Sequence, residues 1–211
     1  MNDLTKEISG YKIYLQLLEE RLLTKYFENQ KDYIFCKKGC ADCCKHGEYP
    51  TTKIELQYIA LGFVQLPKDL QQEILMKINE IAECKRNYTA KVPFTYECPF
   101  LVNNVCCLYD YRMIICRTHG LMFFMDNNGK NGNKIPACVH LGLNYSNVYD
   151  KETNMISSDM WQKTGIKNPP LAYNISQKVL LNNVMTEPLG FEFGETKALI
   201  DWFYDADVQL K

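Results

Sequence analysis

The sequence predicts an α+β protein that is mainly helical, with short β-hairpins in a cysteine-rich middle region packed on helices. Three observations predict this class. Stretches near the N-terminus carry apolar residues at helical spacing, two middle stretches flank Asn-rich turns, and all ten cysteines fall between residues 36 and 138. With 46% hydrophobic and 23% charged residues, a chain of 211 residues can bury a core.

Three helices are predicted in the first part of the chain. The first covers residues 3–29, where apolar side chains recur in steps of three and four, at Leu4, Ile8, Tyr11, Leu15, Leu18 and Leu22. A second begins at Thr52, which forms a capping box with Glu55, and ends near Gly62. A third follows Pro67, with an apolar face at Leu70, Ile74, Ile78 and Ile81. Cys84 extends this face, so we expect a buried packing thiol there.

Two hairpins are predicted in the middle of the chain. Residues 98–102 and 105–109 flank a tight turn at Asn103 and Asn104. Residues 121–125 and 134–139 flank a second turn at 127–129, which places Cys138 on the far strand. Between the hairpins, Asp110 is expected to cap a short helical turn. From about residue 150 the chain has no cysteine and is predicted to be mostly helical, around 155–164, 171–185 and 195–204.

Charge and hydropathy exclude some classes of partner. The net charge is −1 and the pI is near 6.3, which argues against binding to nucleic acid. No apolar run reaches the length of a bilayer span, so no membrane association is expected. The N-terminal stretch carries Asp3 and Glu7 and lacks the pattern of a secretory signal. We therefore expect a cytoplasmic protein, in which ten cysteines would not persist as disulfides.

The cysteine spacing favours metal binding over disulfides and nucleophilic chemistry. Four cysteines lie within the run CKKGCADCC, and a thiolate binds soft or borderline ions strongly. A loop with C-x3-C-x2-C spacing can place three thiolates around an iron–sulfur cluster, whereas zinc sites more often use two C-x2-C pairs. This favours iron–sulfur, and [4Fe–4S] in particular, but leaves zinc open. The expected metal ligands are Cys36, Cys40, Cys43, Cys44, Cys98, Cys106, Cys116 and Cys138. Eight thiolates suit two four-ligand sites, or one cluster with spare thiols.

Two arginines flank one of these cysteines. We predict that Arg112 and Arg117 contact the cofactor, because guanidinium groups offset the negative charge of a thiolate site. The alternative is an ordinary ion pair with Asp or Glu. The histidines at 46, 119 and 140 each lie within three residues of a cysteine. Each is compatible with three roles: a metal ligand, a hydrogen-bond donor to a ligand, or an exposed side chain.

The ordered set of cysteines resembles the YkgJ-like cysteine-cluster family, which is described as zinc- or iron-chelating. The resemblance covers about residues 34–140. It rests on CKKGCADCC, on Cys98-Pro99-Phe100-Leu101, on Cys106 with Leu108-Tyr109, and on Arg112 with Cys116-Arg117. The first gap is one residue longer than in the family, Met113 stands where the family usually has Pro, and Cys107 is an extra thiol. The family includes the longer flagellin lysine N-methylases, which are linked to an iron–sulfur centre and S-adenosylmethionine.

Three functions are compatible with this pattern. The first is a metal-binding module of residues 1–149, with a helical extension of residues 150–211; its iron–sulfur cluster or zinc supports binding to a protein partner or metal transfer. The second is an S-adenosylmethionine-dependent iron–sulfur enzyme, such as a protein lysine N-methylase. Cys36, Cys40 and Cys43 match the radical S-adenosylmethionine spacing, but Asp42 stands where an aromatic residue is expected. The third is a thiol redox protein that uses Cys40 and Cys43. The sequence assigns no catalytic residue.

Overall fold

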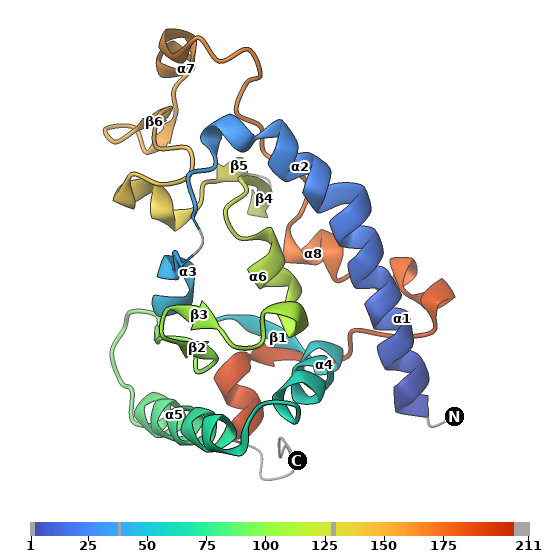
Figure 1. Cartoon of the computed structure of the whole chain (residues 1–211). Helices are drawn as coiled ribbons and strands as arrows, with labels where there is room; N and C mark the ends of the chain where they lie inside the picture. The colour runs from blue at the N-terminus through green and yellow to red at the C-terminus, as the bar shows by residue number, and fades with distance from the viewer. Residues whose placement is uncertain (1–2, 38, 128–129, 205–211) are drawn as a thin grey trace. The chain divides into compact units, whose positions relative to one another are not determined.

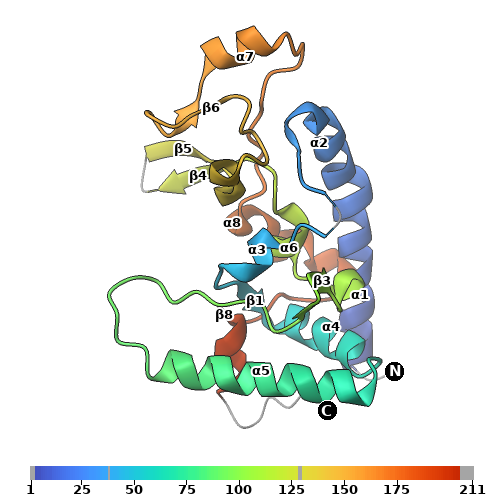
Figure 2. The ribbon, with the colours of Figure 1, turned by 60° about the vertical axis from the view of Figure 1, so that its left-hand side comes forward.

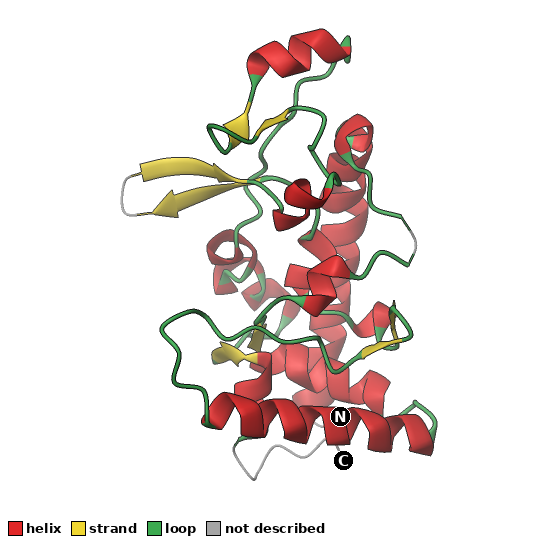
Figure 3. Ribbon diagram, turned by 90° about the vertical axis from the view of Figure 1, so that its left-hand side faces the viewer, coloured by secondary structure: helices red, strands yellow, loops and turns green. Residues whose placement is uncertain are grey.

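The structure is a computed structural model, and it describes residues 3–37, 39–127 and 130–204. Helices are far more extensive than strands, and each sheet in these ranges is one pair of antiparallel strands (Figure 3). This confirms the predicted class, α+β and mainly helical.

Figure 1 gives the order of the elements. The α-helices are α1 (Asp3–Leu17), α2 (Thr24–Asn29), α3 (Asp42–Lys45), α4 (Lys53–Phe63), α5 (Lys68–Arg86), α6 (Ile114–Thr118), α7 (Ser158–Thr164) and α8 (Gln177–Leu180). A π-helix, η1 (Leu18–Leu23), joins α1 to α2, and the 3-10 segments are η2 (Lys31–Tyr33), η3 (Tyr109–Tyr111), η4 (Ala137–Leu141), η5 (Asn183–Met185), η6 (Glu187–Leu189) and η7 (Leu199–Phe203). The strand pairs are β1 (Pro50–Thr52) with β8 (Thr196–Ala198), β2 (Leu101–Val102) with β3 (Val105–Cys106), β4 (Phe123–Asn127) with β5 (Lys130–Lys134), and β6 (Tyr149–Asp150) with β7 (Met155–Ile156).

The chain divides into two compact units. Of the described residues, the first unit comprises 3–12, 41–116 and 183–204, and the second unit comprises 13–37, 39–40, 117–127 and 130–182. The predicted domain boundary at residue 149 falls inside the second unit.

The predicted helices form where local signals are strong. Residues 3–29 are helical throughout, as α1, η1 and α2. Thr52 caps α4 with the predicted capping box, in which the Thr52 side chain accepts from the Glu55 N–H and the Glu55 side chain accepts from the Thr52 N–H. Helix α5 follows Pro67, as predicted. The first stripe is only partly buried, because Leu4 and Leu22 are exposed.

The core of the first unit is formed by residues of α4, α5 and η7 and of the segments that join them. Its buried residues include Tyr49, Ile59, Phe63, Ile78, Phe100, Met113 and Leu199. The N–H of Leu199 donates to the Tyr49 carbonyl (2.8 Å), and the Trp202 indole donates to the Thr51 carbonyl (2.9 Å). Helix α5 contacts η7 along this core (Figures 1 and 2), where Lys85 pairs with both Glu48 and Asp201.

The core of the second unit is aromatic. Tyr33 and Tyr145 stack with ring centroids 5.8 Å apart, and both are fully buried. The Tyr145 N–H donates to the Tyr33 carbonyl (2.7 Å), which joins the segment before Cys36 to the segment after η4. The β4–β5 pair forms the second predicted hairpin, and its turn at 128–129 lies outside the described residues.

Four sequence predictions are wrong in detail. Cys84 is exposed, because the buried positions of α5 are Gln71, Ile74, Ile78 and Ala82, and two residues beyond Ala82 is about 200° around the helix. Cys138 lies in η4 and not on a strand. Asp110 lies within η3, which has no side-chain cap.

The fourth error concerns the C-terminal part of the chain, which is less helical than predicted. Residues 155–156 form β7 and residues 196–198 form β8. Strand β8 pairs with β1, whose residues lie 144 to 148 positions earlier in the sequence, and this long-range pairing overrides the local helical pattern.

Candidate metal centre

The cysteines fall into two groups, one in each unit. The first unit holds a six-thiol group, which consists of Cys43, Cys44, Cys98, Cys106, Cys107 and Cys116. The second unit holds a three-thiol group, which consists of Cys36, Cys40 and Cys138. Cys84 stands on the exposed side of α5. In the described part of the chain, which includes every cysteine, no disulfide is formed.

Three separate stretches of sequence contribute to the six-thiol group. Helix α3 carries Cys43 and Cys44, whose sulfur atoms are 4.0 Å apart. The Cys98 N–H donates to the Cys44 carbonyl (2.7 Å), so the second stretch is fixed directly against the first. An isolated bridge between Gly47 and Tyr96 holds the same two stretches together.

The first predicted hairpin holds the next two thiols. Leu101 pairs with Cys106 across the β2–β3 ladder, and Asn103 and Asn104 both have positive φ, as a tight two-residue turn requires. Cys107 is bound twice to one carbonyl, since its N–H (3.0 Å) and its thiol (3.2 Å) both donate to Phe100. The thiol of Cys107 is therefore committed to the backbone of the hairpin.

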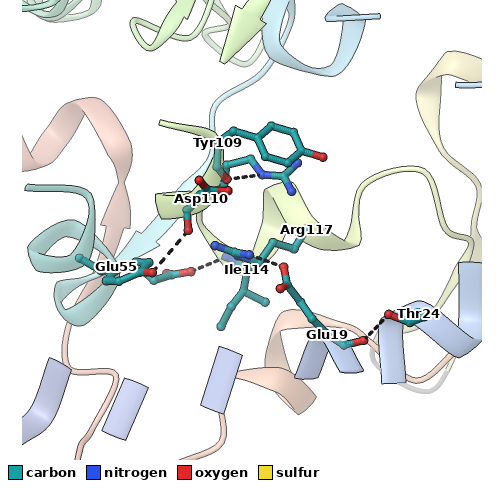
Figure 4. A network of polar contacts seen from close by, with 9 residues as sticks. Glu19, Thr24, Glu55, Tyr109, Asp110, Ile114 and Arg117 are labelled. Carbon is teal, nitrogen blue, oxygen red and sulfur yellow. Dashed lines mark hydrogen bonds and ion pairs between the residues drawn. The ribbon is translucent and has the colours of Figure 1, made fainter. Parts of the chain in front are cut away.

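Helix α6 places Cys116, and a distant carboxylate fixes the start of that helix. Glu55 is 2% exposed, and its Oε1 accepts from the Ile114 N–H at 2.8 Å (Figure 4). Its Oε2 accepts from the N–H and the hydroxyl of Thr52, both at 2.8 Å. One side chain thus satisfies the starts of both α4 and α6. The sequence pattern identified the capping of α4 by Glu55 but missed this second role.

Tyr49 lies close to four of the six thiols and was not identified from the sequence. Burial is the main cause that raises the pKa of its hydroxyl, and the thiols of Cys43, Cys44, Cys116 and Cys98 raise it further. A Cβ atom on Gly47 would overlap the Tyr49 ring, so only glycine allows this packing. The only sequence signal for Tyr49 is its position just after the cysteine run.

Burial and mutual repulsion both disfavour the thiolate forms of Cys98, Cys106, Cys107 and Cys116. Burial raises the pKa of Cys116 to about 12, with the charge of Cys106 as the next cause. Burial also raises the pKa of Cys98, with the charge of Cys116 as the next cause. It raises the pKa of Cys107 to about 11. Without a cation these thiols are neutral at physiological pH, so a metal ion that binds them must displace their protons.

Arg112 opposes this effect at Cys106 and Cys116. Its guanidinium lowers the pKa of both Cys106 and Cys116, although burial outweighs it and the net shifts are upward. Its Nε donates to the Tyr109 carbonyl (2.8 Å), and its Cζ lies 3.5 Å from the centroid of the Tyr109 ring. These contacts fix the charge on the side of Cys106 and Cys116.

Arg117 has a different environment. It is 9% exposed, belongs to the second unit and forms an ion pair with Glu19 of η1 (Figure 4). The Glu19 carbonyl in turn accepts from the hydroxyl of Thr24 (2.8 Å). An ion pair with a carboxylate was the alternative to cofactor contact, and for Arg117 cofactor contact stays a prediction.

The three-thiol group surrounds Cys36. Interaction with Cys138 is the largest cause that raises the pKa of the Cys36 thiol, followed by burial, whereas Cys40 acts in the opposite direction. His140, two residues from Cys138, is exposed and lies edge-on to Tyr149 with ring centroids 5.3 Å apart.

The donors have the chemistry of a metal site, but they do not form a complete one. Within residues 3–37, 39–127 and 130–204, no three His, Cys, Asp or Glu side chains are arranged so that they could hold a metal ion. The eight predicted ligands divide between the two units, and the cysteine-rich metal centre stays a prediction.

Comparison with known proteins returns no relatives. No protein-family model, curated protein or solved structure matches this chain. The resemblance to the YkgJ-like family therefore rests on the cysteine pattern alone. Across the described residues, no helix combines the length and the apolar character that crossing a bilayer requires.

Proposed function

We propose that this protein binds metal through its cysteines and holds an iron–sulfur cluster or zinc in the six-thiol group. The observation that carries the proposal is the gathering of thiols from three separate stretches of sequence, four of which, those of Cys43, Cys44, Cys98 and Cys116, act on the pKa of Tyr49. In a reducing compartment such as the cytoplasm, disulfides would not explain this concentration of sulfur. A metal ion or cluster would, because it replaces the thiol protons and neutralises the thiolates.

The expected ligands are four thiols that influence one another, those of Cys43, Cys98, Cys106 and Cys116, and Cys44 lies next to Cys43. The charges of Cys106 and Cys43 raise the pKa of Cys116, and those of Cys116 and Cys106 raise the pKa of Cys98. The charge of Cys43 also raises the pKa of Cys106. Cys107 is excluded, since its thiol already donates to the Phe100 carbonyl. All four belong to the seven cysteines that carry the resemblance to the YkgJ-like family.

An iron–sulfur cluster fits this arrangement better than a single zinc ion. The sulfur atoms of Cys43 and Cys44 are 4.0 Å apart, and the thiols of Cys98, Cys106 and Cys116 act on one another through charge. A polynuclear core spans more space than one ion, so its ligands lie farther apart. We therefore favour a cluster of the [4Fe–4S] type.

Metal analysis of protein purified without oxygen tests the proposal. We expect iron and acid-labile sulfide, with a brown colour that bleaches on reduction; zinc in their place would give a colourless protein. Cys116→Ser should lose this metal, whereas Cys107→Ser should retain it, because the two cysteines lie in the same unit but only Cys116 is an expected ligand. Protein that contains neither iron nor zinc after native expression would refute the proposal.

A further inference from the structure

The long N-terminal helix contains a π turn, which shifts the phase of its buried side. The elements α1, η1 and α2 follow one another without a break (Figure 1). At the end of η1 the Thr24 N–H donates to the Glu19 carbonyl, five residues earlier, and the Thr24 hydroxyl donates to the same oxygen (2.8 Å). A π turn holds one residue more than an α turn, so the residues after it are rotated by about 100° from their α-helical positions.

Burial of the leucines on either side of the π turn shows this shift. Leu15 and Leu18 are buried, and α-helical spacing would bury Leu22 next. Instead Leu22 is 39% exposed and Leu23 is 4% exposed. The new phase continues to Gln30, seven residues after Leu23, which is fully buried.

The phase of α2 decides which residues face the segment after α7. We call residues 169–173 the strap; α2 and the strap both belong to the second unit. The Gln30 amide bonds to the strap twice, since its Oε1 accepts from the Leu171 N–H (2.8 Å) and its Nε2 donates to the carbonyl at the start of the strap (3.3 Å). Tyr26 stacks on Tyr173, with ring centroids 3.9 Å apart. The π turn therefore sets the contacts that hold the strap.

The sequence of this helix offers the same chemistry one residue earlier. Three residues at α-helical spacing in the observed phase are each preceded by a residue of the same class: Leu23 by Leu22, Phe27 by Tyr26 and Gln30 by Asn29. Were the helix α-helical throughout, the first member of each pair would take the place of the second. Both phases thus present a leucine, an aromatic ring and an amide to the same surroundings.

We propose that α1, η1 and α2 form a register switch that holds or releases the strap. In the observed register the π turn is present, Leu23 is buried and Gln30 bonds to the strap. In the second register the π turn is absent, α2 is rotated by about 100° and Leu22 replaces Leu23. Asn29 then faces the strap, and its side chain is one methylene too short to make both bonds. The switch does not rest on the proposed metal binding.

Hydrogen exchange of the strap in the full-length protein tests the switch. Leu22 is on the surface in the observed register and buried in the second, so Leu22→Gln disfavours only the second register. We expect exchange of the Leu171 amide to slow by about tenfold, because fewer molecules open through the second register. Leu17→Gln is the matched control, since Leu17 is 44% exposed and lies before the π turn. Exchange at Leu171 that is unchanged in Leu22→Gln, or that slows equally in Leu17→Gln, would overturn the inference.

Deletion of Leu22 gives a second test. It removes the extra residue of the π turn, so Leu23 and the residues after it keep their places in a helix that is α-helical throughout. We expect the same slowing at Leu171 and no change at Ser157, whose N–H donates to the Val148 carbonyl (2.8 Å) in the same unit. Loss of protection at Ser157 in this variant would contradict the proposal.

Leu23→Gln should have the opposite effect, because it disfavours the observed register. We expect about tenfold faster exchange at Leu171 and unchanged exchange at Ser157. Equal acceleration at both amides would show that Leu23 only supports the fold of the second unit and that there is no second register.

Discussion

Gly47 leaves open the space that the ring of Tyr49 fills. Any side chain at Gly47 would overlap this ring, which lies among the thiols of the six-thiol group. The same glycine bridges to Tyr96, two residues before Cys98. A residue without a side chain therefore determines how the first two stretches of the six-thiol group come together.

Gly47→Ala should displace the Tyr49 ring and destabilise the first unit. Overpacking of this kind costs about 1–3 kcal/mol, and the displaced ring would also disturb the thiols around it. Urea unfolding and metal content would both be measured. Gly132→Ala is the matched control, because nothing lies within 4 Å of a Cβ at that position. Equal effects of the two substitutions would show that the Tyr49 packing is unimportant.

Glu55→Ala should destabilise the protein more than an ordinary surface substitution. It leaves the Ile114 N–H and the Thr52 N–H without their acceptor, at about 1–3 kcal/mol for each buried group. The start of α6 should loosen and Cys116 should become easier to alkylate. Glu73→Ala is the control, since its ion pair with Lys77 is half-exposed and should contribute less than about 1 kcal/mol. An unchanged unfolding midpoint for Glu55→Ala would contradict the double capping role.

Arg112→Met should weaken metal binding by the six-thiol group. The guanidinium favours the thiolates of Cys106 and Cys116, so its loss raises the proton affinity of both. We expect about a tenfold loss in metal affinity at constant pH, measured by competition with a chelator. Arg86→Met removes the same charge from a site over the Tyr204 ring and should leave the affinity unchanged.

Tyr145 should make stability fall at high pH. Burial raises the pKa of its hydroxyl to about 12, so the folded state keeps its proton where the unfolded state, with a pKa near 10, loses it. The resulting stability is complete below pH 10 and is lost as the pH rises towards 12. Urea unfolding at pH 8 and pH 11 should show a smaller difference for Tyr145→Phe than for wild type.

Tyr145→Phe also has a cost at neutral pH, because the hydroxyl accepts from the Met122 N–H (3.3 Å). The comparison is therefore between slopes with pH and not between absolute stabilities. An identical slope for the variant and the wild type would show that Tyr145 is not the group responsible.

Local signals allowed much of the fold to be predicted. The capping box at Thr52 and the Asn103–Asn104 turn depend on residues within a few positions, and both formed as expected. The pairing of β1 with β8 could not be predicted, because each strand has three residues and the paired residues are 144 to 148 positions apart. Cys84 was misassigned because the buried face of α5 follows Ala82 and not Ile81.

The candidate site was predictable in composition but not in arrangement. The density of cysteines indicated which residues to consider, yet nothing in the run CKKGCADCC indicates that Cys36 and Cys40 belong to one unit and Cys43 to the other. Glu55 accepts from the Ile114 N–H, 59 positions away, and Asn144 accepts from the Cys36 N–H, 108 positions away. At such separations sequence spacing carries no information.

The backbone contact between Leu199 and Tyr49 has a consequence for synthesis of the protein. A ribosome will have made all ten cysteines well before it reaches Leu199, so the contact between Leu199 and Tyr49 forms after the thiols have been made. During that interval the thiols of the nascent chain are not yet buried as they are in the folded first unit. If the first unit binds metal as we propose, its site should be complete only after Leu199 has been made, and thiols that oxidise before then should yield protein without metal.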